Sequence, residues 1–201
     1  MTFDKLFRHI NPKRALDIGA HVGGFTKSLL AQFPNCQVVM VEANSHCEPH
    51  LQTIGCAYEI VALCDYNGQA LLYMENGNQI GTGASLYKEN TVWYSKGDKQ
   101  TVTTKRLDDC NYFDGAPIDL IKMDVQGAEL DIIKGGENTI KNATFVLMET
   151  SLLQYNQGAP LIDSVVEKMV SMDFCMWDIV EYHKLSDGTI FQLDILFKNL
   201  R

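Results

Sequence analysis

RALDIGAHVGG, residues 14–24, joins a short apolar run to a glycine-rich turn. Such a turn lets a ligand approach the backbone, and the N-terminus of the helix that follows offers free N–H groups. The dinucleotide fingerprint G-x-G-x-x-G would place its middle glycine at position 21, where this chain has His21. The pattern that remains, with Asp17, Gly19 and Gly23, suits a nucleoside that carries no diphosphate.

Apolar runs and helical patterns alternate along the rest of the chain. The first elements follow the order strand, helix, strand, helix, strand, which predicts an α/β fold with a mostly parallel central sheet and helices on both faces. The sheet strands are expected at 14–20, 37–43, 58–64, 118–125 and 144–149, and the helices at 25–33, 45–55, 127–134 and 162–172. Two further strands are expected at 69–75 and 101–107, and a closing antiparallel pair at 175–180 and 190–197.

The chain contains no internal repeat, low-complexity tract or linker, so a single domain over residues 1–201 is expected. Residues 1–13 form its N-terminal helical lead. The polar, glycine-rich stretch 76–100 is expected as an inserted surface loop, and loops of this length tend to be functional. Ser45 is the expected N-cap of the second helix, and the pair Gly135-Gly136 is expected to end the helix before the fifth strand.

Charge and composition exclude several classes of partner. The 201 residues include 17 basic and 25 acidic ones, which gives a net charge of −8 and a pI near 5.0. Nucleic acid and anionic membranes both attract basic surfaces, so neither is an expected partner. No apolar run reaches the ~18 residues that span a bilayer, and residues 1–14 lack the apolar core of a signal peptide. The six cysteines form no CxxC pair, which predicts free thiols and a cytoplasmic protein.

Glu42 ends the second expected strand, 23 residues after Gly19. A carboxylate about 20 residues beyond a glycine turn is placed to accept hydrogen bonds from ribose hydroxyls. Both residues belong to strand ends at the same edge of the sheet, so together they predict a nucleoside site. The alternative, an ordinary strand-to-helix turn with a surface glutamate, ranks second.

Several segments resemble, in the expected order, the class I S-adenosylmethionine-dependent methyltransferases and, within them, the FkbM-type family. The resemblance covers residues 14–151 and is most specific at DVQGAE, residues 124–129. It implies a Rossmann-like class I methyltransferase fold, S-adenosylmethionine as cofactor, and a hydroxyl of a sugar, glycan or secondary metabolite as the small-molecule acceptor. The segments are LDIGAHVGGFT, VEAN, VALCDYNGQA, GASL, KRLDD, IDLIKMDVQGAELDIIKGG and METS.

The same resemblance implies a role for individual residues. Glu42 takes the ribose hydroxyls, Ala62 and Leu63 border the adenine, and Asp124 lies beside the transferred methyl group. The residues implied around the methionine and ribose parts of the cofactor are Asp17, Gly19, Ala20, His21 and Gly23. These positions fall at the carboxyl ends of strands, where open α/β sheets bind their ligands.

Asp124, Glu149 and Glu129 form the candidate catalytic group. Asp124 and Glu149 end adjacent expected strands, and Glu129 lies in the first turn of the helix between them. An acceptor hydroxyl must lose its proton as it attacks the methyl group, and a nearby carboxylate can take that proton. The structural alternatives are a helix-dipole interaction for Glu129 and a solvated strand end for Glu149.

No metal is expected to be required. Catechol-type O-methyltransferases hold a hard cation with an Asp-Asn pair after the fifth strand, whereas this chain has Glu149-Thr150-Ser151 there. His46 and His50 are four residues apart but lack the H-E-x-x-H pattern, so an exposed helix face is the better interpretation. His183 is either a second base or, more commonly for a lone histidine, a surface residue.

Two other functions fit parts of the pattern. An NAD-dependent oxidoreductase is disfavoured by His21 and by the absence of a Tyr-x-x-x-Lys set, and a catalytically inactive nucleoside-binding module is disfavoured by the carboxylates. DVQG, residues 124–127, is not the Asn/Asp-Pro-Pro-aromatic motif of nucleobase methyltransferases, which argues against base flipping. Tyr87, Trp93 and Tyr94 either stack on a sugar or ring acceptor or pack their own loop.

Overall fold

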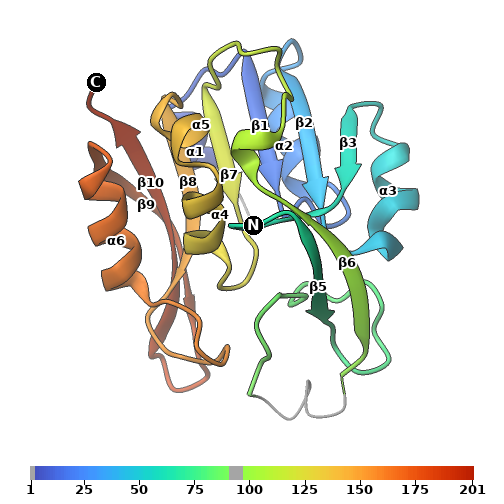
Figure 1. The fold of residues 1–201 in the computed structure, drawn as a ribbon. Helices are drawn as coiled ribbons and strands as arrows, with labels where there is room; N and C mark the ends of the chain where they lie inside the picture. The colour runs from blue at the N-terminus through green and yellow to red at the C-terminus, as the bar shows by residue number, and fades with distance from the viewer. Residues whose placement is uncertain (1–2, 91–96) are drawn as a thin grey trace.

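Seven strands form the central sheet of a computed structural model, which describes residues 3–90 and 97–201 (Figure 1). The first five strands in the sheet run parallel, and β10 is antiparallel to both β8 and β9. This arrangement confirms the predicted α/β fold and its closing antiparallel pair. The spatial order is β3 (Ala57–Ile60), β2 (Gln37–Glu42), β1 (Arg14–Ile18), β7 (Leu120–Met123), β8 (Phe145–Ser151), β10 (Ile190–Asn199) and β9 (Phe174–Lys184).

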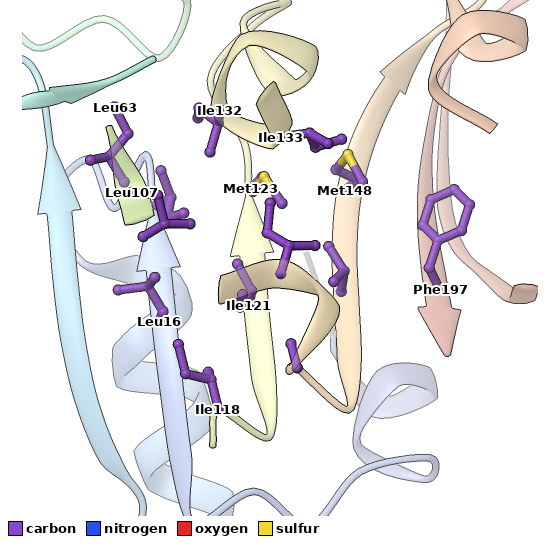
Figure 2. Close-up of a cluster of buried hydrophobic side chains, with 14 of the residues drawn as sticks. Leu16, Leu63, Leu107, Ile118, Ile121, Met123, Ile132, Ile133, Met148 and Phe197 are labelled. Atoms are coloured by element: carbon purple, nitrogen blue, oxygen red, sulfur yellow. The ribbon is translucent and has the colours of Figure 1, made fainter. Parts of the chain in front are cut away.

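Helices cover both faces of this sheet: α1 (Asp4–Phe7), α2 (Gly24–Gln32), α3 (Glu48–Gln52), α4 (Glu129–Gly135), α5 (Glu137–Lys141) and α6 (Ile162–Ser171). Buried parallel strands present apolar side chains alternately to each face. Leu16 of β1 accordingly joins the cluster formed with α4 and α6, whereas its neighbour Ala15 joins the cluster formed with α1 and α2. Figure 2 shows the first cluster, in which Ile132 and Ile133 of α4 lie over the strands.

The expected third strand is divided between two sheets. Residues 57–60 form β3, whereas β4 (Ala62–Leu63) joins β6 (Lys99–Lys105) and β5 (Gly68–Tyr73) in a three-stranded sheet of order β4-β6-β5. The prediction of one continuous strand over 58–64 is wrong at Val61, where the chain changes partner. Because β4 pairs with a strand far away in the sequence, the local pattern does not reveal this change.

The beginnings of two helices differ from those predicted. Asn44 is the cap, because its side chain accepts a hydrogen bond from the N–H of His46 (3.1 Å), and a 3-10 turn over Ser45–Cys47 then precedes α3. The prediction that Ser45 is the N-cap is therefore wrong by one residue. The helix α4 begins two residues later than expected, and α5 starts directly after the Gly135-Gly136 pair.

The inserted stretch predicted at 76–100 is partly folded onto the molecule. Ser85 is 2% exposed and forms an isolated bridge with Tyr73 of β5. Its hydroxyl also donates to the backbone carbonyl of Gln126 (2.8 Å), in the turn between β7 and α4. This part of the stretch therefore reaches the end of the central sheet instead of remaining a free surface loop.

Both ends of the chain contain the predicted kinds of element. The helix α1 occupies the N-terminal lead, and its Leu6 is fully buried. The closing strands β9 and β10 are longer than predicted, with 11 and 10 residues.

All six cysteines are free thiols. No helix in the described ranges 3–90 and 97–201 is long and apolar enough to cross a bilayer.

We expect Gly135→Ala to destabilise the protein, because a Cβ at this position would lie 2.0 Å from the backbone carbonyl oxygen of Cys64. To relieve this clash, α4 must move away from the end of β4, which should lower the unfolding free energy by about 1–3 kcal/mol. Gly24→Ala is the control, since nothing lies within 4 Å of its Cβ position and alanine favours a helix. Chemical denaturation gives both differences in unfolding free energy. No loss for Gly135→Ala would contradict this packing.

Candidate active site

A cavity of about 420 Å³ lies at the carboxyl ends of β1, β2 and β7. The strand order reverses between β1 and β7, and open α/β sheets bind ligands at such a switch point. Loop residues 81–86 and Glu149 of β8 also line the cavity. The predicted site residues in its lining are Gly19, Ala20, His21, Glu42, Ala62, Leu63, Asp124 and Glu149.

Glu42 lies at the end of β2 with its carboxylate fixed by two backbone donors. The N–H of His21 donates to Oε2 and the N–H of Asn44 donates to Oε1, each at 2.7 Å. Burial raises the pKa of Glu42, and the two N–H donors oppose part of that rise. Each carboxylate oxygen has a second lone pair, so Glu42 can accept further hydrogen bonds from a ligand in the cavity.

The wall beside Glu42 is apolar. Val61, Ala62, Leu63 and Leu72 line it, and each is between 2% and 4% exposed. An apolar wall suits the face of an aromatic base, and the neighbouring carboxylate suits a ribose. This end of the cavity therefore fits a nucleoside.

Gly19 turns the chain at the end of β1 with a φ of +74°. A Cβ there would lie 1.9 Å from the backbone carbonyl oxygen of Asp124. The glycine-rich turn predicts a close approach of a ligand to this glycine, but the close approach of β1 to the end of β7 already requires a residue without a side chain. A side chain at position 19 would therefore disturb the fold as well as the cavity.

Lys122 is a buried lysine at the centre of the site, and the sequence analysis missed it. Its Nζ donates to the carbonyl oxygen of Gly19 (3.1 Å) and lies 3.4 Å from Asp17 Oδ1 and 3.3 Å from Asp124 Oδ2. Burial alone would lower the pKa of Lys122, but the two carboxylates outweigh burial and raise this pKa above its ordinary value. Its position inside an apolar strand could have indicated its importance, because a buried lysine requires partners of opposite charge or hydrogen-bond acceptors.

Asp17 and Gly23, both predicted to contact the cofactor, do not line the cavity. Asp17 is fully buried and accepts a hydrogen bond from the Thr26 hydroxyl (2.7 Å) while facing Lys122. A Cβ on Gly23 would lie 1.9 Å from Cδ1 of Ile54. In the structure Asp17 holds Lys122, and Gly23 allows the start of α2 to pack closely. Their contacts with a cofactor stay a prediction.

Asp124 and Glu149 meet at the other end of the cavity through one shared side chain. Gln126 Nε2 donates to Asp124 Oδ1 (2.9 Å) and to Glu149 Oε1 (2.7 Å), and its Oε1 accepts from the Tyr155 hydroxyl (2.9 Å). Gln192 Nε2 donates to Glu149 Oε1 as well (2.6 Å). Burial and the neighbouring carboxylates raise the pKa of Glu149 to about 9. The structure thus joins two predicted catalytic residues through glutamines that the sequence analysis did not single out.

Glu129 is not among the residues that line the cavity. It is 4% exposed, and its Oε1 accepts hydrogen bonds from the N–H groups of Val125 (3.3 Å) and Gly127 (3.2 Å). Gln126, between them, has a φ of +56°, a left-handed conformation that costs free energy. In the structure Glu129 therefore holds the turn that presents Gln126, and its predicted role as a base stays a prediction.

Two side chains connect the inserted loop to the nucleoside end of the cavity. His21 Nε2 donates to the carbonyl oxygen of Ile80 and Asn44 Nδ2 donates to that of Gln79, each at 2.7 Å. Since a carbonyl only accepts, Nε2 of His21 carries the proton. The residue that departs from the dinucleotide fingerprint therefore holds the loop beside the cavity.

The three histidines considered as functional residues are in different environments. His46 and His50 are exposed, as expected, and belong to no metal-ligating cluster among the described residues. His183 instead lines the cavity beside Glu149, although a surface position was the commoner expectation.

The aromatic residues of the inserted loop were predicted to stack on an acceptor or to pack their own loop. Tyr87 does the second, since its hydroxyl donates to Asp131 Oδ2 (2.6 Å) and its N–H donates to the Ser85 hydroxyl (2.9 Å). Trp93 and Tyr94 lie outside the described residues, so for them the prediction stays open.

The family model of the methyltransferase FkbM domain matches residues 17–176. The chain belongs to the FkbM methyltransferase family. Membership confirms the resemblance carried by the sequence motifs and assigns the chain a methyltransferase function. It therefore favours methyl transfer over the alternative of an NAD-dependent oxidoreductase.

Individual relatives agree with this assignment. The chain is similar to 2-O-methyltransferase NoeI of Sinorhizobium fredii (strain NBRC 101917 / NGR234), with 27% identity over 202 residues, 92% of this chain and 79% of that protein. Its fold is similar to methyltransferase FkbM from Methylobacillus flagellatus KT (TM-score 0.59, 13% identity), covering 92% of this chain but only 44% of that one. M. capricolum TrmK, solved with S-adenosylhomocysteine, matches 99% of this chain and 68% of its own (TM-score 0.57, 9% identity).

Glu129→Gln should change how stability depends on pH. Burial raises the pKa of Glu129 from 4.5 to about 7 in the folded protein, so the native state binds more protons than the unfolded state between these values. The unfolding free energy of the wild type should therefore fall by up to about 3 kcal/mol as pH rises through this window, and the variant should lack that component.

Denaturant unfolding at about pH 5 and about pH 8 measures this effect as the difference between wild type and variant. Glu167→Gln, an exposed position on α6, is the control and should keep the wild-type pH dependence. If the difference between wild type and Glu129→Gln does not change with pH, the buried position of Glu129 is contradicted.

Proposed function

We propose that the chain is an S-adenosylmethionine-dependent O-methyltransferase that acts on a hydroxyl of a sugar, glycan or secondary metabolite. The proposal rests on one observation, which is that a single cavity has Glu42 and an apolar wall at one end and the carboxyl groups of Asp124 and Glu149 at the other. A methyl donor and an alcohol acceptor must meet in one space, within about 3–3.5 Å. The relative NoeI is described as a 2-O-methyltransferase, which agrees with transfer to oxygen.

The first end of the cavity fits the proposed cofactor. Glu42 has lone pairs for the ribose hydroxyls, Ala62 and Leu63 offer an apolar wall to the adenine, and Gly19 and Ala20 border the path toward Asp124. When bound, S-adenosylmethionine supplies an electrophilic methyl group on a positively charged sulfur. That positive charge suits a cavity whose Glu42, Asp124 and Glu149 are acidic.

The second end of the cavity suits an uncharged, hydroxyl-rich acceptor. Gln126 and Gln192 line it with amides, and Asp124 and Glu149 line it with carboxyl groups. These groups donate to and accept from hydroxyls, whereas the negative charge would repel a phosphate. This supports a small-molecule or glycan acceptor and opposes nucleic acid.

Asp124 is the proposed general base. Its side chain is 34% exposed, against 12% for Glu149, so its carboxylate is the more accessible to an acceptor. Lys122 and Gln126 fix its orientation. As the acceptor oxygen would bond to the methyl carbon, the bond from that carbon to the sulfur would break and the hydroxyl proton would pass to Asp124. Glu149 is less accessible and is held by Gln126 and Gln192, so it orients the acceptor instead.

Glu42→Ala should weaken S-adenosylhomocysteine binding by about 1–3 kcal/mol, because two ribose hydroxyls lose their acceptor. Isothermal titration calorimetry measures the change, and a thermal melt checks that the N–H groups of His21 and Asn44, left without Glu42, do not unfold the variant. Glu167→Ala on the exposed face of α6 is the control. Unchanged affinity in Glu42→Ala, or NAD binding tighter than S-adenosylhomocysteine, would count against the proposed cofactor.

Asp124→Asn should lower kcat by about 10²–10⁴-fold, since general-base catalysis contributes this much. The KM for S-adenosylmethionine should change little. The assay follows homocysteine release over a panel of sugars, with Asp163→Asn at the exposed start of α6 as the control. A normal kcat with a raised cofactor KM would make Asp124 an anchor for the methionine group. Cofactor binding without turnover on any acceptor would favour an inactive nucleoside-binding module.

A further inference from the structure

Three strands at the acceptor end of the cavity bring together side chains that can ligate a metal. Glu149 on β8 lies directly opposite Asp194 on β10, and His183 lies on the next strand, β9. His183 Nε2 is 3.9 Å from Glu149 Oε2 and 3.9 Å from Asp194 Oδ1. All three ligand atoms lie within 4.8 Å of one another. The three side chains thus surround one small space.

The atoms that face this space lack hydrogen bonds. A separation of 3.9 Å is too long for a hydrogen bond between His183 and either carboxylate. His183 Nε2 is buried and has no partner among the described residues. Asp194 is 7% exposed, and its Oδ1 lies 3.9 Å from His183 Nε2, too far for a hydrogen bond. Glu149 accepts both of its glutamine hydrogen bonds through Oε1, which leaves Oε2 toward the same space.

The charges around this space do not balance. Glu149 and Asp194 are direct cross-strand neighbours, and like charges in that arrangement destabilise a sheet. Lys122, a buried cation in the lining of the same cavity, is already shared by Asp17 and Asp124. A positive ion between the two carboxylates would remove this repulsion.

We propose that Glu149, His183 and Asp194 bind a divalent transition-metal ion through Oε2, Nε2 and Oδ1. One imidazole nitrogen with two carboxylate oxygens suits ions such as Mn²⁺, Fe²⁺ or Zn²⁺ better than Mg²⁺ or Ca²⁺, which prefer oxygen ligands alone. Metal–ligand bonds of ~2.1 Å place neighbouring ligand atoms about 3.0–3.5 Å apart. The two separations of 3.9 Å therefore need to close by less than about 1 Å around the ion, and the third by less than about 2 Å.

The ion would also have a place in the proposed reaction, and this step rests on the proposed function. Glu149 and His183 line the cavity where the acceptor is expected. Three protein ligands leave coordination positions open, so a hydroxyl of the acceptor can bind the ion and lose its proton more readily. The expectation that no metal is required considered only the ends of the fourth and fifth strands. His183 and Asp194 come from the two closing strands instead.

Titration of the chelator-stripped full chain with Mn²⁺, followed by electron paramagnetic resonance of the free ion, tests the site. We expect one Mn²⁺ per chain, with the affinity lowered at least about tenfold in His183→Ala and in the nearly isosteric Asp194→Asn. Asp187→Asn, in the exposed β9–β10 turn, is the control and should bind as the wild type does. Thermal melts identify a variant that fails to fold, in which case the other variant decides.

A second titration with S-adenosylhomocysteine separates this proposal from the proposed function. Its affinity should be unchanged in His183→Ala and Asp194→Asn, because the nucleoside end lies at Glu42. A wild type that binds S-adenosylhomocysteine but no Mn²⁺, or variants that bind Mn²⁺ as tightly as the wild type, would overturn the metal site alone. A wild type that binds Mn²⁺ but not S-adenosylhomocysteine supports the metal site and overturns the proposed function.

Discussion

The burial of Lys122 between the ends of β1 and β7 is the interaction on which the rest of the site depends. A buried ammonium group without partners would cost several kcal/mol, and here Asp17, Asp124 and the carbonyl oxygen of Gly19 surround it. The ammonium group therefore holds the glycine turn against the strand that carries Asp124. Gly19 allows this closeness because it has no Cβ. The glycine turn and the carboxylate of Asp124 are thus fixed by one cation.

Much of the fold was predictable because buried parallel strands are continuous apolar runs, which stand out in a sequence. The runs 37–43, 118–125 and 144–149 correspond to β2, β7 and β8 for this reason. The split of residues 58–64 into β3 and β4 was not predictable, since it depends on pairing with β6, a strand in a different part of the chain. The cap at Asn44 was missed because Asn and Ser are almost equally good caps.

Those parts of the site were predictable whose residues lie a characteristic number of residues apart along the chain. Glu42 follows from its distance to the glycine turn, whereas the neighbourhood of Glu149 does not. Asp194 becomes its partner only through the antiparallel register of β8 and β10, which apolar patterning of short strands leaves undetermined. A carboxylate near a cleft has the same sequence pattern whether it faces the cavity or caps a backbone turn, so the sequence does not reveal that Glu129 holds the turn at Gln126.

The charges of the cavity also bear on the course of the proposed reaction. A carboxylate at about 4 Å attracts a sulfonium by about 1–4 kcal/mol, depending on how much water screens the pair. Once the methyl group has left, the sulfur is neutral and this attraction is lost. In the same step the acceptor proton neutralises Asp124, so the net charge at this end of the cavity stays the same. The acidic lining therefore favours the charged donor over its neutral product, and a neutral product leaves such a cavity more easily than the donor does.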